Sequence, residues 1–203
     1  MGDYEAIRAL LIPIHGVFGV LALLSGLVAL SVSKRWPWHP RAGRAFLVSM
    51  ALAIVIATPV IIAAKNVFLL GLELLVVYHG AVAWRLARMK PPARLPGAVD
   101  RQIHLVFALG FIAFALWGAR LLIHGVAMGL VPVVLSIVSL ISVRHFSRFM
   151  RRTSFEPGEW LPEHIRGMAA AFIASVTAFA AATGPASFPE CRPSSFGSRL
   201  PSC

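Results

Sequence analysis

Lys34-Arg35-Trp36-Pro37-Trp38-His39-Pro40-Arg41-Ala42-Gly43-Arg44 is a short basic segment between two long apolar runs, and it decides how the chain is arranged. Basic loops between membrane spans stay in the cytoplasm, and this bias sets the orientation of the whole protein. If this loop is inside, the side on which every later segment lies follows from counting the spans.

The composition excludes an ordinary soluble domain. The chain has 203 residues, of which 58% are hydrophobic and only 13% are charged, whereas soluble domains carry about 25% charged residues. The net charge of +11 could indicate nucleic-acid binding. Here, however, the cations fall in clusters between apolar runs and no recognition motif accompanies them. We therefore expect a lipid bilayer as the partner and no nucleic acid.

Six apolar runs are long enough, or nearly so, to cross a membrane, which takes about 20 residues as a helix. They predict an all-α transmembrane bundle of six spans in one domain, residues 1–183. The Pro- and Ser-rich tail, residues 184–203, is expected to be disordered. The expected spans are Ile7–Leu30, Ala45–Ala64, Val67–Trp84, Ile103–Ile123, Gly125–Val143 and Gly167–Thr183.

The basic residues divide unequally between the two sides of this bundle. Fourteen of the 19 fall in the first, third and fifth loops. By the positive-inside rule, these loops are cytoplasmic and both termini lie outside the inner (plasma) membrane. The fourteen are Lys34, Arg35, Arg41, Arg44, Arg85, Arg88, Lys90, Arg94, Arg101, Arg144, Arg148, Arg151, Arg152 and Arg166.

A polar cluster is predicted in the outer half of the bundle. Glu73 lies about 9 Å and His15 about 12 Å from the outer ends of their spans, at about 1.5 Å per residue. Arg120 and His124 end the fourth span on the same side. An intramembrane carboxylate usually faces the bundle interior. The cluster could be a proton, ion or ligand site, or it could hold the helices together through hydrogen bonds.

Histidines on the inner side raise the alternative of a b-type haem. His79 lies within the third span, and with His104 or His164 it could supply two axial ligands from neighbouring helices. The other interpretation is that these histidines sit at the membrane interface or cap carbonyl groups. No Cys/His metal spacing is present, and no catalytic motif of the hydrolase, metalloprotease or nucleotide-binding kind appears. We assign no catalytic residues and expect no metal site.

Three stretches have the character of motifs: His39-Pro-Arg-Ala-Gly-Arg44, Asn66-Val-Phe-Leu-Leu70, and Trp160-Leu-Pro-Glu-His-Ile-Arg-Gly-Met168 with the following Ala171-Phe-Ile-Ala-Ser-Val-Thr-Ala-Phe179. They resemble an uncharacterised family of bacterial multi-span integral membrane proteins. The resemblance covers roughly residues 7–179 and implies an architecture rather than an activity. The motif residues that it singles out are His39, Arg41, Gly43, Arg44, Asn66, Glu163 and Thr177.

The chain departs from this family at its end. Members usually continue beyond the Thr-Ala-Phe motif with apolar residues, an Asn and often another hydrophobic segment. Here the chain turns into Gly184-Pro-Ala-Ser-Phe-Pro-Glu-Cys191 and a Ser/Arg/Pro tail. The departure suggests a truncated or shifted end.

Three functions remain open from the sequence. The first is an accessory membrane protein without chemistry of its own, which needs nothing beyond the features described above. The second is a small proton- or ion-coupled carrier that uses Glu73 and His15. The third is a haem-bearing electron carrier.

Overall fold

Six α-helices make up the fold in the computed structural model, which describes residues 2–88, 97–152, 156 and 158–183. Each of the six is long and apolar enough to cross a membrane. The predicted all-α bundle of six spans is therefore confirmed; the tail from residue 184 lies outside the described residues. The helices are α1 (Gly2–Ser31), α2 (Trp38–Ala63), α3 (Val67–Ala87), α4 (Ala98–Ile123), α5 (Leu130–Met150, after the short 3₁₀-helix η1, Ala127–Gly129) and α6 (Trp160–Thr183).

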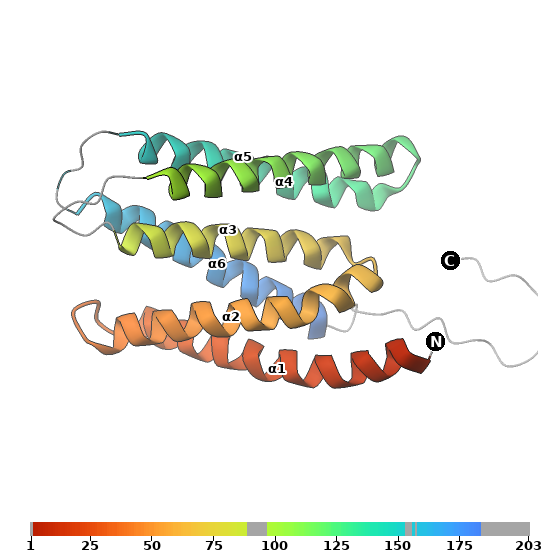
Figure 1. Cartoon of the computed structure of the whole chain (residues 1–203), viewed down its shortest axis with the longest axis horizontal. Helices are drawn as coiled ribbons and strands as arrows, with labels where there is room; N and C mark the ends of the chain where they lie inside the picture. The colour runs from red at the N-terminus through yellow and green to blue at the C-terminus, as the bar shows by residue number, and fades with distance from the viewer. Residues whose placement is uncertain (1, 89–96, 153–155, 157, 184–203) are drawn as a thin grey trace, which may run out of the picture.

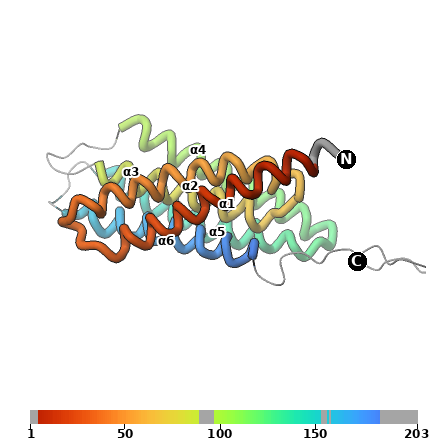
Figure 2. Tube along the Cα trace, turned by 90° about the horizontal axis from the view of Figure 1, so that it is seen from below, coloured from red at the N-terminus to blue at the C-terminus, as the bar shows by residue number. Residues whose placement is uncertain are grey.

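The helices stack as three pairs: α1 with α2, α3 with α6, and α4 with α5 (Figure 1). The middle pair joins the other two, because α3 also contacts α2, α4 and α5. All six helices run along the long axis of the molecule in two perpendicular views (Figure 2). Helix α3 is accordingly the most buried of the six.

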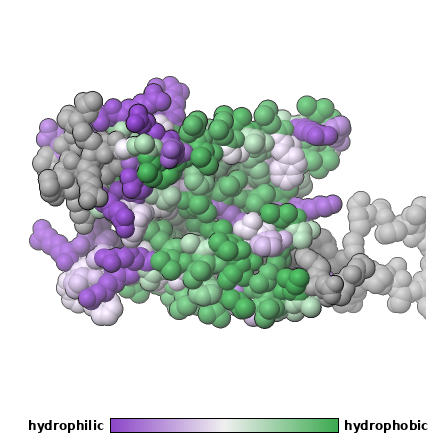
Figure 3. Space-filling view, viewed as in Figure 1, coloured by the Kyte–Doolittle hydropathy of each residue, from purple (hydrophilic) through white to green (hydrophobic). Residues whose placement is uncertain are grey.

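The helices extend beyond the apolar runs mainly at the basic end of the bundle. The motif at His39 belongs to the first turns of α2, and Arg85 and Asp100 are helical rather than part of a loop. Charged residues gather at this end, whereas the flanks of the bundle are covered with apolar side chains (Figure 3). Many large apolar side chains are exposed along α1, α2, α4 and α5. Such an extensive apolar surface suits contact with lipid rather than water.

The turn between α2 and α3 is fixed by its own side chains. Pro59 lies inside α2 near this turn, and Lys65 has a φ of 53°, which lets the chain reverse. The side chain of Asn66 accepts a hydrogen bond of 3.1 Å from the backbone N–H of Leu69. This bond satisfies one of the free donors at the start of α3, which is the role of a helix N-cap. The motif residue Asn66 therefore has a structural function.

Glycines allow the backbones of paired helices to come close together. A Cβ atom built at Gly167 on α6 would lie 2.9 Å from the Cβ of Ala83 and 3.2 Å from the carbonyl oxygen of His79, both on α3. A Cβ at Gly118 on α4 would lie 2.6 Å from Cγ of Pro132 on α5. Small residues at helix contacts are the usual means of association in membranes, where apolar burial against lipid gains little.

Replacing Gly167 by Leu should separate α3 from α6. We expect a loss of about 1–3 kcal/mol in unfolding free energy, because the new side chain has no space at this contact. The matched control is Gly110→Leu on α4, where an added Cβ meets no atom within 4 Å. Thermal unfolding in detergent measures the difference, and equal midpoints for the two variants would contradict this packing.

Candidate functional site

Two of the four predicted outer polar residues, His15 and Glu73, bind α2 and not one another. Nδ1 of His15 donates a hydrogen bond of 2.9 Å to the carbonyl oxygen of Ala53. Glu73 accepts one of 3.1 Å from the hydroxyl of Thr58. Within the described part of the chain, no hydrogen bond or ion pair joins any two of His15, Glu73, Arg120 and His124. The similar depths of His15 and Glu73 thus reflect two separate contacts with α2.

Arg120 and His124 lie at the surface of the bundle. Both side chains are exposed, near the end of α4 and in the turn that follows it. Neither has a described hydrogen bond or ion pair. The structure therefore places them at the same end as Glu73 without bonding them to it.

Thr58 connects Glu73 to the backbone of α2. Its hydroxyl lies 2.7 Å from the carbonyl oxygen of Ile54 and 3.1 Å from Oε2 of Glu73. A hydroxyl has only one hydrogen to donate, so it serves these two acceptors alternately. Thr58 was not singled out by the sequence, although a hydroxyl one residue before Pro59 is a signal that could have been noticed.

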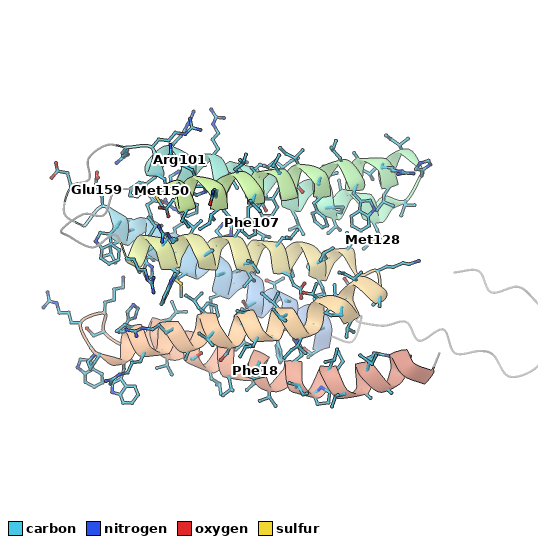
Figure 4. All side chains as sticks on the ribbon, viewed as in Figure 1. Phe18, Arg101, Phe107, Met128, Met150 and Glu159 are labelled. Carbon is cyan, nitrogen blue, oxygen red and sulfur yellow. The ribbon has the colours of Figure 1, made fainter. Side chains whose placement is uncertain are left out.

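The inner histidines His79 and His104 belong to an aromatic core. Tyr78 is fully buried and its hydroxyl is hydrogen-bonded to Nδ1 of His104 over 3.1 Å. Its ring centroid lies 5.1 Å from that of His79 and 5.9 Å from that of His104. Phe107 points from α4 toward α3 (Figure 4) and lies 5.4 Å from Tyr78. Phe146 completes the contact from α5.

This packing does not fit a haem between His79 and His104. Axial ligation would place a flat macrocycle between the two imidazoles. Instead, the ring of Tyr78 packs against both of them, with interplanar angles of 78° and 67°. Nδ1 of His79 also donates a hydrogen bond of 2.9 Å to the carbonyl oxygen of Leu75, one turn earlier on the same helix.

The pair His79 and His164 does not fit a haem either. Nδ1 of His164 donates a hydrogen bond of 2.9 Å to the carbonyl oxygen of Ala83, so α6 lies directly against α3. The close approach at Gly167 involves the carbonyl oxygen of His79 itself. The two helices are therefore too close at this level for a haem macrocycle to lie between them.

Two histidines fasten α1 to α2 in opposite directions. His15 on α1 donates a hydrogen bond to α2. In the other direction, Nδ1 of His39 on α2 donates a hydrogen bond of 2.8 Å to the carbonyl oxygen of Ala29 on α1. Because a carbonyl oxygen can only accept, each bond fixes the proton on Nδ1. Half-buried imidazoles thus act as interhelical clamps, as His164 does between α6 and α3.

An ion pair clamps α3 to α4 at the basic end. Nε of Arg85 lies 2.7 Å from Oδ1 of Asp100, and a terminal nitrogen of the same guanidinium lies 2.9 Å from Oδ2. The carboxylate is buried and also accepts a hydrogen bond of 2.8 Å from the backbone N–H of Gly97, the residue just before α4. Two-point pairing of this kind fixes geometry as well as charge.

Glu163, another motif residue, clamps α6 to α5. Its Oε2 accepts a hydrogen bond of 2.9 Å from Nε2 of His145 on α5, and Arg166 on its own helix contacts the same oxygen. The motif residues Arg41 and Thr177 have local roles. The guanidinium of Arg41 lies 5.6 Å from the ring centre of Trp38. The hydroxyl of Thr177 donates a hydrogen bond of 2.9 Å to the carbonyl oxygen of Ile173.

A cavity of about 600 Å³ opens at the basic end, between the α1–α2 pair and the α3–α6 pair. The motif residues Gly43 and Arg44 line it, as do the clamp residues His39 and His164. Apolar side chains such as Phe46 and Phe172 form much of the remaining wall. A second cavity, of about 400 Å³, lies between α2 and α3 and shares Arg44, Leu47 and Trp84 with the first.

The sequence did not identify Lys34, Arg88, Trp84 and Trp160 as parts of one cavity. In the sequence, Lys34 and Arg88 count only toward the positive-inside charge, and Trp160 appears only as part of a motif. The sequence shows that all four lie near the basic ends of their spans. It does not show that α6 lies beside α3, because that contact depends on tertiary packing. Among the described residues, no group of three or more His, Cys, Asp or Glu side chains could hold a metal ion.

No family model, curated protein or solved structure matches this chain. The resemblance to a bacterial membrane family therefore stays a prediction, and the site must be interpreted from its own geometry.

Asp100→Asn should destabilise the fold while leaving the volume of the side chain almost unchanged. It removes the charge-assisted pairing with Arg85, and we expect a loss of about 1.5–3 kcal/mol. The control is Glu159→Gln, which breaks the exposed 3.2 Å ion pair with Arg152 and should cost less than about 1 kcal/mol. If chemical denaturation gave the two variants equal losses, the Arg85–Asp100 clamp would not have this role.

Proposed function

We propose that the chain is a non-enzymatic accessory protein of the bacterial inner membrane, inserted with both termini outside. The observation that carries this proposal is the use of the intramembrane polar groups. His15, His39 and His164 bind carbonyl oxygens of neighbouring helices, and Glu73 accepts from Thr58. Groups already committed to holding helices together are poorly placed to perform chemistry, so the accessory role needs no further assumption.

The orientation rests on the distribution of cations. The turn between α1 and α2 and the adjoining ends of α3, α4, α5 and α6 lie at one end of the bundle (Figure 1). Of the fourteen cations counted in the odd-numbered loops, the twelve that the structure describes belong to the segments at that end. Positive charge within short loops keeps them in the cytoplasm, so this end is assigned to the inside.

The orientation can be measured with two matched cysteines in a chain whose Cys191 and Cys203 are replaced by Ser. Ser33→Cys places a thiol in the exposed turn before α2, and Ala64→Cys places one in the exposed turn after it. A maleimide that cannot cross the membrane should label Ala64→Cys in intact cells and Ser33→Cys only after the cells are opened. The reverse pattern would show the opposite orientation.

The fastening role can be separated from a carrier role by stability. His15→Ala and Glu73→Ala should each lower the unfolding free energy by about 0.5–1.5 kcal/mol, because each removes an interhelical hydrogen bond. Arg120→Ala and His124→Ala should change it by less than about 0.5 kcal/mol, as for other exposed substitutions. Proton uptake into vesicles that is lost in Glu73→Gln, in a variant of unchanged stability, would instead favour the carrier.

A further inference from the structure

Three cations surround the larger cavity without carboxylate partners. Lys34 precedes α2, Arg44 lies in its second turn, and Arg88 ends α3, so different segments bring them together. Within the described residues, none of the three forms an ion pair. Clustered like charges repel, and an anion bound among them would relieve this repulsion.

Apart from His39 and His164, the rest of the cavity wall is mainly apolar, and it extends into the membrane. Along α6 the lining begins at Trp160 and ends at Phe172, which is a rise of about 18 Å at about 1.5 Å per residue. One leaflet of the hydrocarbon core is about 15 Å thick. The cavity therefore reaches from the interface to about the middle of the bilayer, and a small hydrophilic anion would leave most of its wall uncovered.

The second cavity gives the site a second apolar branch. It leaves the same position, since Arg44, Leu47 and Trp84 line both cavities. Along α2 it extends from Arg44 to Ile54, a rise of about 15 Å. Two apolar branches that diverge from one cation match the shape of a head group with two hydrocarbon chains.

Indole side chains mark the level at which the branches meet. Trp84 and Trp160 line the larger cavity, and the guanidinium of Arg88 lies 4.5 Å from the ring centre of Trp84. Tryptophan is enriched at the level of lipid head groups. Basic pockets between transmembrane helices at this level are suited to anionic head groups.

We propose that this pair of cavities binds an anionic diacyl phospholipid from the leaflet on the side of the basic loops. Its phosphate lies among Lys34, Arg44 and Arg88, one acyl chain lies between the α1–α2 and α3–α6 pairs, and the other lies in the branch between α2 and α3. This lipid would fill the seam between the α1–α2 pair and the rest of the bundle.

The test uses the full chain purified in detergent, with lipid binding measured by native mass spectrometry. The probes are phosphatidylglycerol, zwitterionic phosphatidylcholine of the same chains, and soluble glycerol 3-phosphate as the head group alone. We expect phosphatidylglycerol to bind more tightly than phosphatidylcholine, and glycerol 3-phosphate not to displace it. The double variant Arg44→Gln/Arg88→Gln should bind phosphatidylglycerol about 25-fold more weakly, at about fivefold for each cation removed.

The matched control is Arg101→Gln/Arg148→Gln. It removes two exposed cations at the same end of the bundle that line neither cavity, and it should keep the affinity of the original chain. Equal weakening in the two double variants would show only general attraction to the basic end and would overturn the proposal. Displacement by glycerol 3-phosphate would show a site for a soluble phosphate and would also overturn it.

Two cavity-filling variants test the chains without removing charge. Gly43 lines the larger cavity, and a Cβ added there meets no atom within 4 Å, so Gly43→Phe should fold. Ala81→Phe fills the branch between α2 and α3 in the same way. Each should weaken phosphatidylglycerol binding at least tenfold. Unchanged affinity in both variants, with unfolding midpoints like that of the original chain, would refute the proposal even if the double arginine variant fails to fold.

Discussion

Hydrocarbon supplies no hydrogen-bonding partner, so a polar group inside a membrane must find its partner within the protein. This constraint determines what the unusual residues of the chain do. His15, His39 and His164 each direct Nδ1 at a backbone carbonyl of another helix. Backbone carbonyls are present at every turn of every helix, so a histidine gains a partner wherever its span meets a neighbour. The polar residues that look most functional in the sequence therefore become fasteners.

The fasteners work together with close backbone packing. Gly167 brings α6 against α3 at the carbonyl oxygen of His79, and His164 closes the same contact one turn away at Ala83. On the other side of α3, Tyr78 packs among aromatic rings of α4 and α5. Helix α3 therefore packs closely on both sides, against α6 at Gly167 and against α4 and α5 through Tyr78, and it occupies the centre of the bundle.

The number of spans and the basic end follow from the sequence because each depends only on local composition. The rotation of each helix does not, because it depends on which neighbour the helix meets. His15 and Glu73 lie at similar depths, as the sequence indicates, yet each binds its own position on α2. Likewise, Asp100 reads as a polar loop residue, but it is buried because the start of α4 packs beside Arg85. The pairing of α3 with α6 joins distant parts of the chain and has no local signal.

The cations of the basic end have two physical roles that the sequence cannot separate. Any Lys or Arg near a span contributes to orientation, since translocating its charge is costly wherever it lies. Only a cation beside a gap between helices can also hold an anion. That gap lies where fastening is sparse: the described bonds from α2 to α3 and α6, Thr58 with Glu73 and Met50 with Ser175, both lie farther along α2 than Arg44, toward the opposite end. Between these bonds and the loops, the described contacts of the α1–α2 pair with α6 are between apolar side chains such as Phe46 and Phe172, and the cavity at Arg44 lies beside them.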